Sequence, residues 1–159
     1  MGIMKGQGAT EYLVLLGAVL IVALVALALL GFFPALSTDA KITQSETYWK
    51  GQAKPFSIQE ISVTTDGNVT MVLQNKDATG TFTLNSITLT RGTDTPATMN
   101  LTNANFAPGD SQTVFNGAVL TGTAAAGTAY SLDVSFAYTS PNGVDGVQTG
   151  AQPIMGRYQ

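Results

Sequence analysis

Residues 12–33 read YLVLLGAVLIVALVALALLGFF, a run of 22 residues without a charged side chain. At about 1.5 Å per residue, such a run makes a helix of about 33 Å, long enough to cross the hydrocarbon core of a bilayer. The preceding segment, KGQGATE at residues 5–11, is polar and ends on a carboxylate. Because a lone carboxylate at the mouth of an apolar helix is costly to bury, we expect Glu11 to find a partner.

The order of these features is not that of an ordinary secretory signal, in which an apolar region of about 7–15 residues is followed by a small-residue cleavage site. The apolar run is longer here, and the polar signals precede it. Lys5-Gly6 followed by QGATEY at 7–12 resembles the class III signal peptide of archaeal type IV pilins. The usual pattern in that family is Gln-x-Ser-x-Glu-Tyr, and this chain has Ala9 where Ser is commoner. The resemblance covers roughly residues 1–35.

The resemblance implies a processing and assembly route. A prepilin peptidase would cut on the cytoplasmic side between Gly6 and Gln7, so that residues 1–6 are removed and Glu11 becomes the fifth residue. The precursor would wait in the cytoplasmic membrane, and an assembly ATPase with a membrane platform would move subunits into a helical homopolymer at the cell surface. The implied product is an adhesion filament, whose subunits are often N-glycosylated.

Within the helix, we expect Glu11 and Tyr12 to serve assembly, together with small residues such as Gly17 and Ala18. Small side chains let neighbouring helices approach closely. The implied domains are therefore a helix over 7–50, first a membrane anchor and then the filament core, and an extracellular β-rich domain over 51–159.

Alternatives share most of these features. A plain signal anchor that tethers an exported binding domain would show the same apolar run, and a basic residue before the run with an acidic one after it fits both readings. A minor pilin or pseudopilin would look nearly the same. What favours a pilin is Glu11, because a tether gains nothing from a carboxylate at the edge of lipid.

Composition restricts the function of residues 38–159. They carry nine acidic and six basic residues without a basic cluster, so nucleic acid is not an expected partner. The chain has neither Cys nor His, which removes the thiol nucleophile, the usual general base and the common transition-metal ligands. We therefore expect no enzymatic activity and no cofactor or metal. Asp66-Gly67-Asn68 and the cluster of Asn103, Asn105 and Asp110 have oxygen ligands for Ca²⁺ but lack EF-hand spacing, and a turn explains each better.

The fold class expected is α+β, with the long apolar helix followed by an antiparallel β-sandwich or barrel. Pro34 should kink or interrupt the helix, with a second helical stretch capped near 37–39 and ending at Gly51. Beyond Pro55 the apolar period changes to two, which is typical of strands. Seven or so short strands are expected. The candidate segments are 56–63, 69–73, a pair of runs at 82–84 and 87–89, then 98–101, 113–115, 130–138 and a last run within 146–158.

Turns and candidate surface features complete the prediction. Asp66-Gly67, Asn116-Gly117 and Pro141-Asn142-Gly143 are turn signals, and the stretch at 124–127 favours a loop. Asn68 and Asn100 begin sequons and are candidate N-glycan acceptors. The aromatic residues at 48, 49 and 56 lie near the junction of helix and domain, where we expect them to pack the helix onto the sheet.

Overall fold

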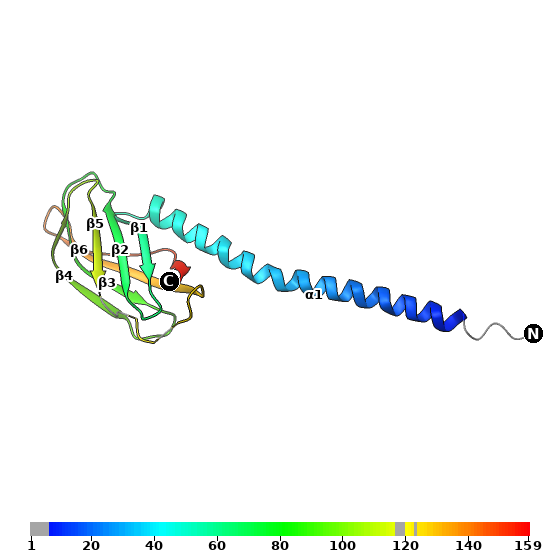
Figure 1. The fold of residues 1–159 in the computed structure, drawn as a ribbon. Coiled ribbons are helices and arrows are strands. Elements are labelled where there is room, and N and C mark those ends of the chain that lie inside the picture. Colours follow the sequence, from blue (N-terminus) through cyan, green and yellow to red (C-terminus); the bar gives the residue numbers. More distant parts are fainter. Residues whose placement is uncertain (1–6, 117–119, 123) are drawn as a thin grey trace, which may run out of the picture. The chain divides into compact units, whose positions relative to one another are not determined.

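The computed structural model describes residues 7–116, 120–122 and 124–159 (Figure 1). Its chain divides into two compact units, Met1–Ala40 and Lys41–Gln159, which we describe separately. In the described residues, the first unit contains most of α1, and the second contains the β-sheets together with the last helical residues.

The helix α1 spans Gln7–Thr47 as one element. It passes Pro34 without a break, so the expected interruption and separate second helix are wrong, while a kink stays a prediction. A proline in a helix interior removes one hydrogen bond and costs about 3 kcal/mol. Once a helix is nucleated each further residue adds a bond, and the Leu- and Ala-rich flanks outweigh that single loss.

The helical segment ends where the sequence indicates. A π-helical turn, η1 (Tyr48–Gln52), follows α1, and the Ala53 N–H donates to the Tyr48 carbonyl at 3.0 Å. Ala53 itself is extended, with φ −64° and ψ 132°. The stop predicted at Gly51 is therefore confirmed to within two residues.

Eight strands follow within the described residues, all paired antiparallel. They are β1 (Phe56–Val63), β2 (Val69–Asn75), β3 (Phe82–Thr90), β4 (Ala97–Phe106), β5 (Ser111–Asn116), β6 (Ala129–Thr139), β7 (Asp145–Thr149) and β8 (Ile154–Arg157). One sheet has three strands in the order β1-β2-β5. The other has five, in the order β4-β3-β6-β7 with β8 also on β6. The predicted α+β class is confirmed, and because both sheets are open the β-part is a sandwich rather than a barrel.

The predicted hairpin around Asp66-Gly67 joins β1 and β2. Gly67 has a φ of 81°, and a Cβ there would collide with the Leu120 carbonyl group, so this turn requires glycine. The turn at 141–143 joins β6 to β7, and residues 124–127 form a loop, as expected. The predicted turn at Asn116-Gly117 extends outside the described residues.

Three strand predictions need correction. The two apolar runs at 82–89 belong to one strand, β3, whose register shifts between Leu84 and Ser86. The irregularity changes which parity of residue number faces inward, so one strand looks like two runs. β4 is longer than the predicted 98–101, because polar residues continue it to Phe106. The last run contains two strands, β7 and β8, separated at 150–153.

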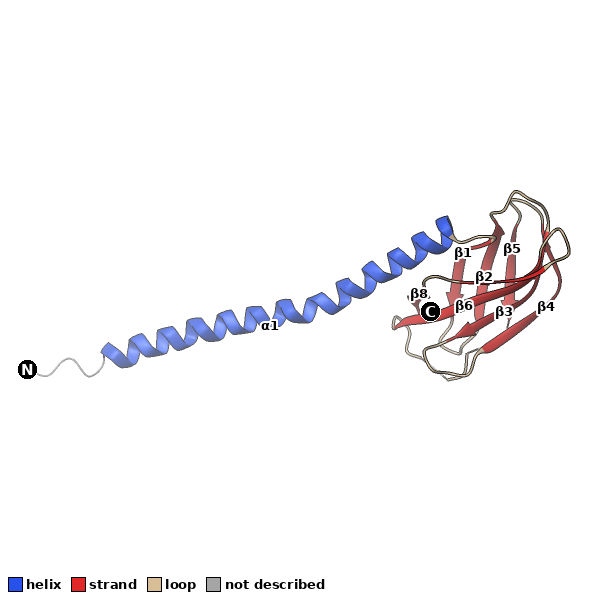
Figure 2. Cartoon of the chain, turned by 180° about the vertical axis from the view of Figure 1, so that it is seen from behind, coloured by secondary structure: helices blue, strands red, loops and turns tan. Residues whose placement is uncertain are grey.

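The two sheets form two layers (Figures 1 and 2), and the buried apolar side chains of both belong to one core cluster. Phe56, fully buried at the start of β1, stacks edge-on against Phe106 at 5.3 Å and lies 5.8 Å from Phe136, both on the opposite sheet. The buried side chain of Gln148 in β7 also bonds Phe56. Its amide oxygen accepts from the Phe56 N–H at 2.9 Å, and its amide N–H donates to the Phe56 carbonyl at 2.7 Å. Phe56 therefore joins the sheets by both its ring and its backbone.

Candidate functional site

Apolar side chains are exposed on every side of α1. Tyr12, Leu13, Val14 and Leu15 are consecutive and expose 67%, 63%, 73% and 65% of their surface. Because successive helical residues point about 100° apart, four in a row sample the whole circumference. A helix that is apolar all round is one that lipid or other protein must cover.

By length and composition, the segment Gly8–Leu30 can cross a membrane. Its 23 residues are close to the roughly 20 that a bilayer core requires. Such a segment is typical of a membrane anchor or a signal sequence.

The predicted assembly residues all lie on α1 near its beginning. Glu11 and Tyr12 are exposed after the first turn, and Gly17 is half-exposed. Ala18 follows Glu11 by seven residues, so at 3.6 residues per turn the two share one face. Gly17 and Tyr12 lie on other sides of the helix. The predicted cleavage bond joins Gly6, outside the described residues, to Gln7, the first residue of α1.

The two sequons occupy different surroundings. Asn100 is exposed on β4, an edge strand of the larger sheet, and Thr102 of the same sequon is also exposed. Asn68 is half-buried in the β1–β2 turn, where its backbone N–H donates to the Thr64 hydroxyl at 3.2 Å and its carbonyl accepts from the Thr64 N–H at 3.0 Å.

The aromatic junction packs within the second compact unit as the sequence predicted. Trp49 exposes 1% of its surface and contacts Tyr48 and Phe136 edge-on, at centroid distances of 5.2 Å and 6.0 Å. Its ring lies so close to Gly150 that a Cβ there would collide with it. Its indole N–H is buried without a hydrogen-bond partner in the described residues.

Polar contacts that the sequence did not predict extend this junction. The Ser45 hydroxyl donates to the Pro153 carbonyl at 2.8 Å and accepts from the Met155 N–H at 3.0 Å, and the Tyr48 hydroxyl accepts from the Ala151 N–H at 3.0 Å. The end of α1 thereby covers the edge of β8. The compact unit accordingly begins at Lys41 rather than at residue 51.

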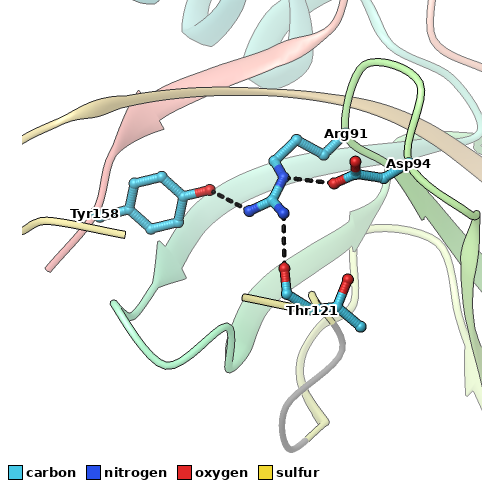
Figure 3. A network of polar contacts seen from close by, with 4 residues as sticks. All are labelled: Arg91, Asp94, Thr121 and Tyr158. Atoms are coloured by element: carbon cyan, nitrogen blue, oxygen red, sulfur yellow. Dashed lines mark hydrogen bonds and ion pairs between the residues drawn. The ribbon is translucent and has the colours of Figure 1, made fainter. Parts of the chain in front are cut away.

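A second unpredicted cluster surrounds Arg91, in the turn after β3 (Figure 3). Its guanidinium donates to the Asp94 carboxylate at 2.8 Å, to the Thr121 carbonyl at 2.7 Å and to the Tyr158 hydroxyl at 3.3 Å. The bond to Tyr158, then that to Asp94, raises the pKa of Arg91. Arg91 and Tyr158 are 67 residues apart. No local sequence motif could therefore predict this cluster, which joins the turn after β3 to the residue that follows β8.

Tyr130 of β6 is buried beside Tyr158, with their rings 5.3 Å apart. Burial first, and then the nearby Tyr158 and Glu46, raise the pKa of Tyr130 to about 12. Burial acts this way because it disfavours the charged tyrosinate.

In the part of the chain that the structure describes, Asp and Glu residues form no group of three that could hold a metal ion. The calcium alternative at residues 66–68 instead coincides with the β1–β2 turn. Comparison of the sequence with models of protein families and with curated proteins gave no match. What remains is a pilin-like layout by shape: an exposed apolar N-terminal helix followed by antiparallel β-sheets.

Proposed function

We propose that the chain is the structural subunit of an extracellular type IV pilus that polymerises through α1. The observation that carries the proposal is the apolar surface that surrounds α1 between Tyr12 and Leu30. Fourteen large apolar or aromatic side chains in this stretch are exposed. At about 1.5–3 kcal/mol each, leaving them in water would cost on the order of 20–40 kcal/mol. That exceeds the roughly 5–15 kcal/mol that stabilises a typical domain, so α1 must always be covered.

A filament subunit has its α1 covered both before and after assembly. Lipid covers α1 in the precursor, and neighbouring copies of α1 cover it in the fibre, so that extraction exposes little apolar surface to water. A helical array of identical, head-to-tail contacts extends without closing. In this proposal the β-domain lies outside the fibre axis, and the membrane peptidase, ATPase and platform implied by the N-terminal motif carry out processing and assembly.

We also propose Asn100, rather than Asn68, as the principal N-glycan acceptor in the exported domain. An acceptor amide must reach a transferase, and Asn100 is exposed on an edge strand whereas Asn68 is half-buried in a tight turn. Peptide mapping by mass spectrometry should find a glycan mass on the Asn100 peptide that Asn100→Gln removes. A glycan on the Asn68 peptide alone would contradict this choice.

The test of the proposed function combines the mass of the mature chain with electron microscopy of the cell surface. We expect the mature chain to start at Gln7, in some preparations cyclised to pyroglutamate, and to form thin fibres. Gly6→Val should block cleavage and abolish fibres. Gly8→Val is the matched control for cleavage, because nothing lies within 4 Å of a Cβ at Gly8 in the single chain. A mature chain that retains Met1, or a processed chain that never forms fibres, would support the tethered domain instead.

A further inference from the structure

Strand β7 lies at one edge of the larger sheet of the sandwich. β7 pairs with β6 on one side and, in the described residues, with no strand on the other. Its pairing with β6 is regular over all five residues, without a shift of register. An edge strand that is regular and unpaired is ready to add another strand.

Of the other edges, that of β5 is the most like β7, because its pairing with β2 is also regular, whereas the rest are bulged or bonded. β1 changes register between Ile58 and Glu60, and its end is paired by the Gln159 N–H, which donates to the Val63 carbonyl at 3.0 Å. The register shift opposite β3 also disturbs β4. The Ser45 hydroxyl bonds the edge of β8, as described above. β5 is tied to β4 through Gln112, whose amide donates to the Asn105 carbonyl at 2.6 Å.

Backbone groups of β7 point away from the sheet at alternate residues. Beyond the two ends of the ladder, the Gly150 N–H donates to the Val134 carbonyl at 3.0 Å and the Ser140 N–H donates to the Val144 carbonyl at 2.8 Å. Because hydrogen-bonded pairs alternate in an antiparallel ladder, the even-numbered residues of β7 bond to β6. The N–H and C=O groups of Asp145, Val147 and Thr149 therefore point outward.

The edge of β7 carries exposed apolar side chains beside its polar residues Asp145 and Thr149. Among the side chains that the structure describes in residues 41–159, two large apolar ones are exposed, Val144 at 64% and Val147 at 68%. Val147 is the central residue of β7, and Val144 lies in the turn just before it. The strand DGVQT has no lysine, proline or bulge, and its protection is limited to its length of five residues and the charge of Asp145 at one end.

We propose that β7 pairs antiparallel with β7 of a second copy of this chain, with Val147 opposite Val147. The strand is self-complementary in this register. Asp145 then lies opposite Thr149 of the other copy, so the two carboxylates are not opposed and each faces a hydroxyl. All three residues with outward backbone groups fall at hydrogen-bonding pairs, and the two larger sheets become one continuous sheet. A shift by two residues would leave one end residue of each β7 without a partner on the other strand.

This contact has two-fold symmetry and cannot by itself extend a fibre. If the chain assembles as proposed above, the contact joins subunits of neighbouring fibres side by side. The pairing does not depend on that function, because it requires only the folded β-sandwich. Its test can therefore be made without filaments.

The test uses single cysteines, since the chain has none of its own. The full-length chain is purified in detergent micelles and oxidised mildly, and dimers are measured on a non-reducing gel. Across a hydrogen-bonded antiparallel pair, Cα atoms are about 5.5 Å apart, within the range of about 4.4–6.8 Å that a disulfide spans. Because the Cβ atoms of such a pair lie somewhat farther apart than a disulfide prefers, the yield depends on a small local adjustment, and Val147→Cys should form more disulfide-linked dimer than any other single cysteine on β7.

Thr149→Cys is the matched control, because it is exposed on the same face of the same strand. In the proposed register the two copies of residue 149 lie about 14 Å apart along the strands, too far for a disulfide. Thr149→Cys alone should give several-fold less dimer, whereas a mixture of Asp145→Cys and Thr149→Cys chains should cross-link to each other. Equal cross-linking of Val147→Cys and Thr149→Cys, or no dimer with Val147→Cys, would overturn the proposal.

Discussion

Glu11 is the single charged residue between Lys5 and Asp39, and it lies exposed at the start of the apolar surface of α1. In the proposed fibre its surroundings become apolar, so its carboxylate needs a donor. The candidates are the freed amine of Gln7 on a neighbouring subunit and local groups such as the Thr10 hydroxyl. Cyclisation of Gln7 would leave only the local groups.

We predict that Glu11→Ala abolishes or strongly reduces fibres while cleavage and export continue. Breaking a buried pair costs about 3–5 kcal/mol, whereas an exposed pair contributes about 1 kcal/mol or less. Glu46→Ala is the control, because Glu46 forms an exposed ion pair with Lys50 at 3.6 Å. Fibre counts by electron microscopy compare the two variants. Normal piliation of Glu11→Ala would show that Glu11 has no part in assembly.

The raised pKa of Tyr130 predicts how the free energy of unfolding changes at alkaline pH. Its pKa in the folded chain is raised to about 12, whereas an unfolded tyrosine has a pKa of about 10. Between these values the folded chain keeps a proton that the unfolded chain has lost. The stability due to the neutral phenol is therefore complete below pH 10 and is lost as pH rises through 12.

We predict a decrease of about 2–3 kcal/mol in the free energy of unfolding over this interval from Tyr130 alone. Tyr130→Phe should remove that part of the decrease and leave the pH dependence between 7 and 9 unchanged. Trp49, the sole tryptophan and a buried one, reports unfolding of the β-unit by its fluorescence. An identical alkaline slope in Tyr130→Phe would contradict the prediction.

Among the secondary-structure elements, the end of α1 contributes to the stability of the β-sandwich. Trp49 fills a space between Phe136 and Gly150, and Ser45 satisfies two backbone groups near β8. Removing these residues would leave a cavity and unpaired buried groups, each of which destabilises a fold. The smallest independently stable unit should therefore include residues 41–50.

We predict that a truncated chain of residues 41–159 unfolds cooperatively, and that residues 53–159 are less stable by at least about 3–5 kcal/mol, the cost of removing one large core aromatic. Urea unfolding followed by circular dichroism measures both. Within 41–159, Trp49→Ala should reproduce most of the loss, and Lys50→Ala, at an exposed neighbouring position, should not. Equal stability of the two truncated chains would show that the junction contributes little.

At the scale of the whole molecule, polymerisation and folding are assigned to different parts of the chain. The exposed apolar surface belongs to residues 12–30, and the packed core belongs to residues from 49 onward. We predict that mature full-length protein forms fibres and that residues 41–159 do not, when both are examined by electron microscopy at equal concentration. Dimers of residues 41–159 through β7 are compatible with this prediction. Fibres of residues 41–159 would place the polymerising contact in the β-sandwich and refute the proposed role of α1.

Much of this architecture could be predicted from local patterns. The uncharged run at 12–33 predicts a long apolar helix, because its Leu- and Ala-rich residues favour helix and its length suits a membrane span. The alternation at 130–138 determines β6 and its buried face, and Asp66-Gly67 determines the first hairpin. These features depend on residues close in sequence, so their physical causes are visible in the sequence.

Other features were decided only by the tertiary structure. Because of the register shift in β3, its apolar pattern looks like that of two strands. The helix continues past Pro34 because its helix-favouring flanks outweigh the loss of one hydrogen bond. The bonds of Arg91 to Tyr158 and of Ser45 to Met155 join residues far apart in the chain. That β7 lies at an edge depends on the strand order of its sheet. Local patterns are enough to predict the elements and their apolar faces, whereas strand order and the long-range polar contacts arise only when packing brings distant residues together.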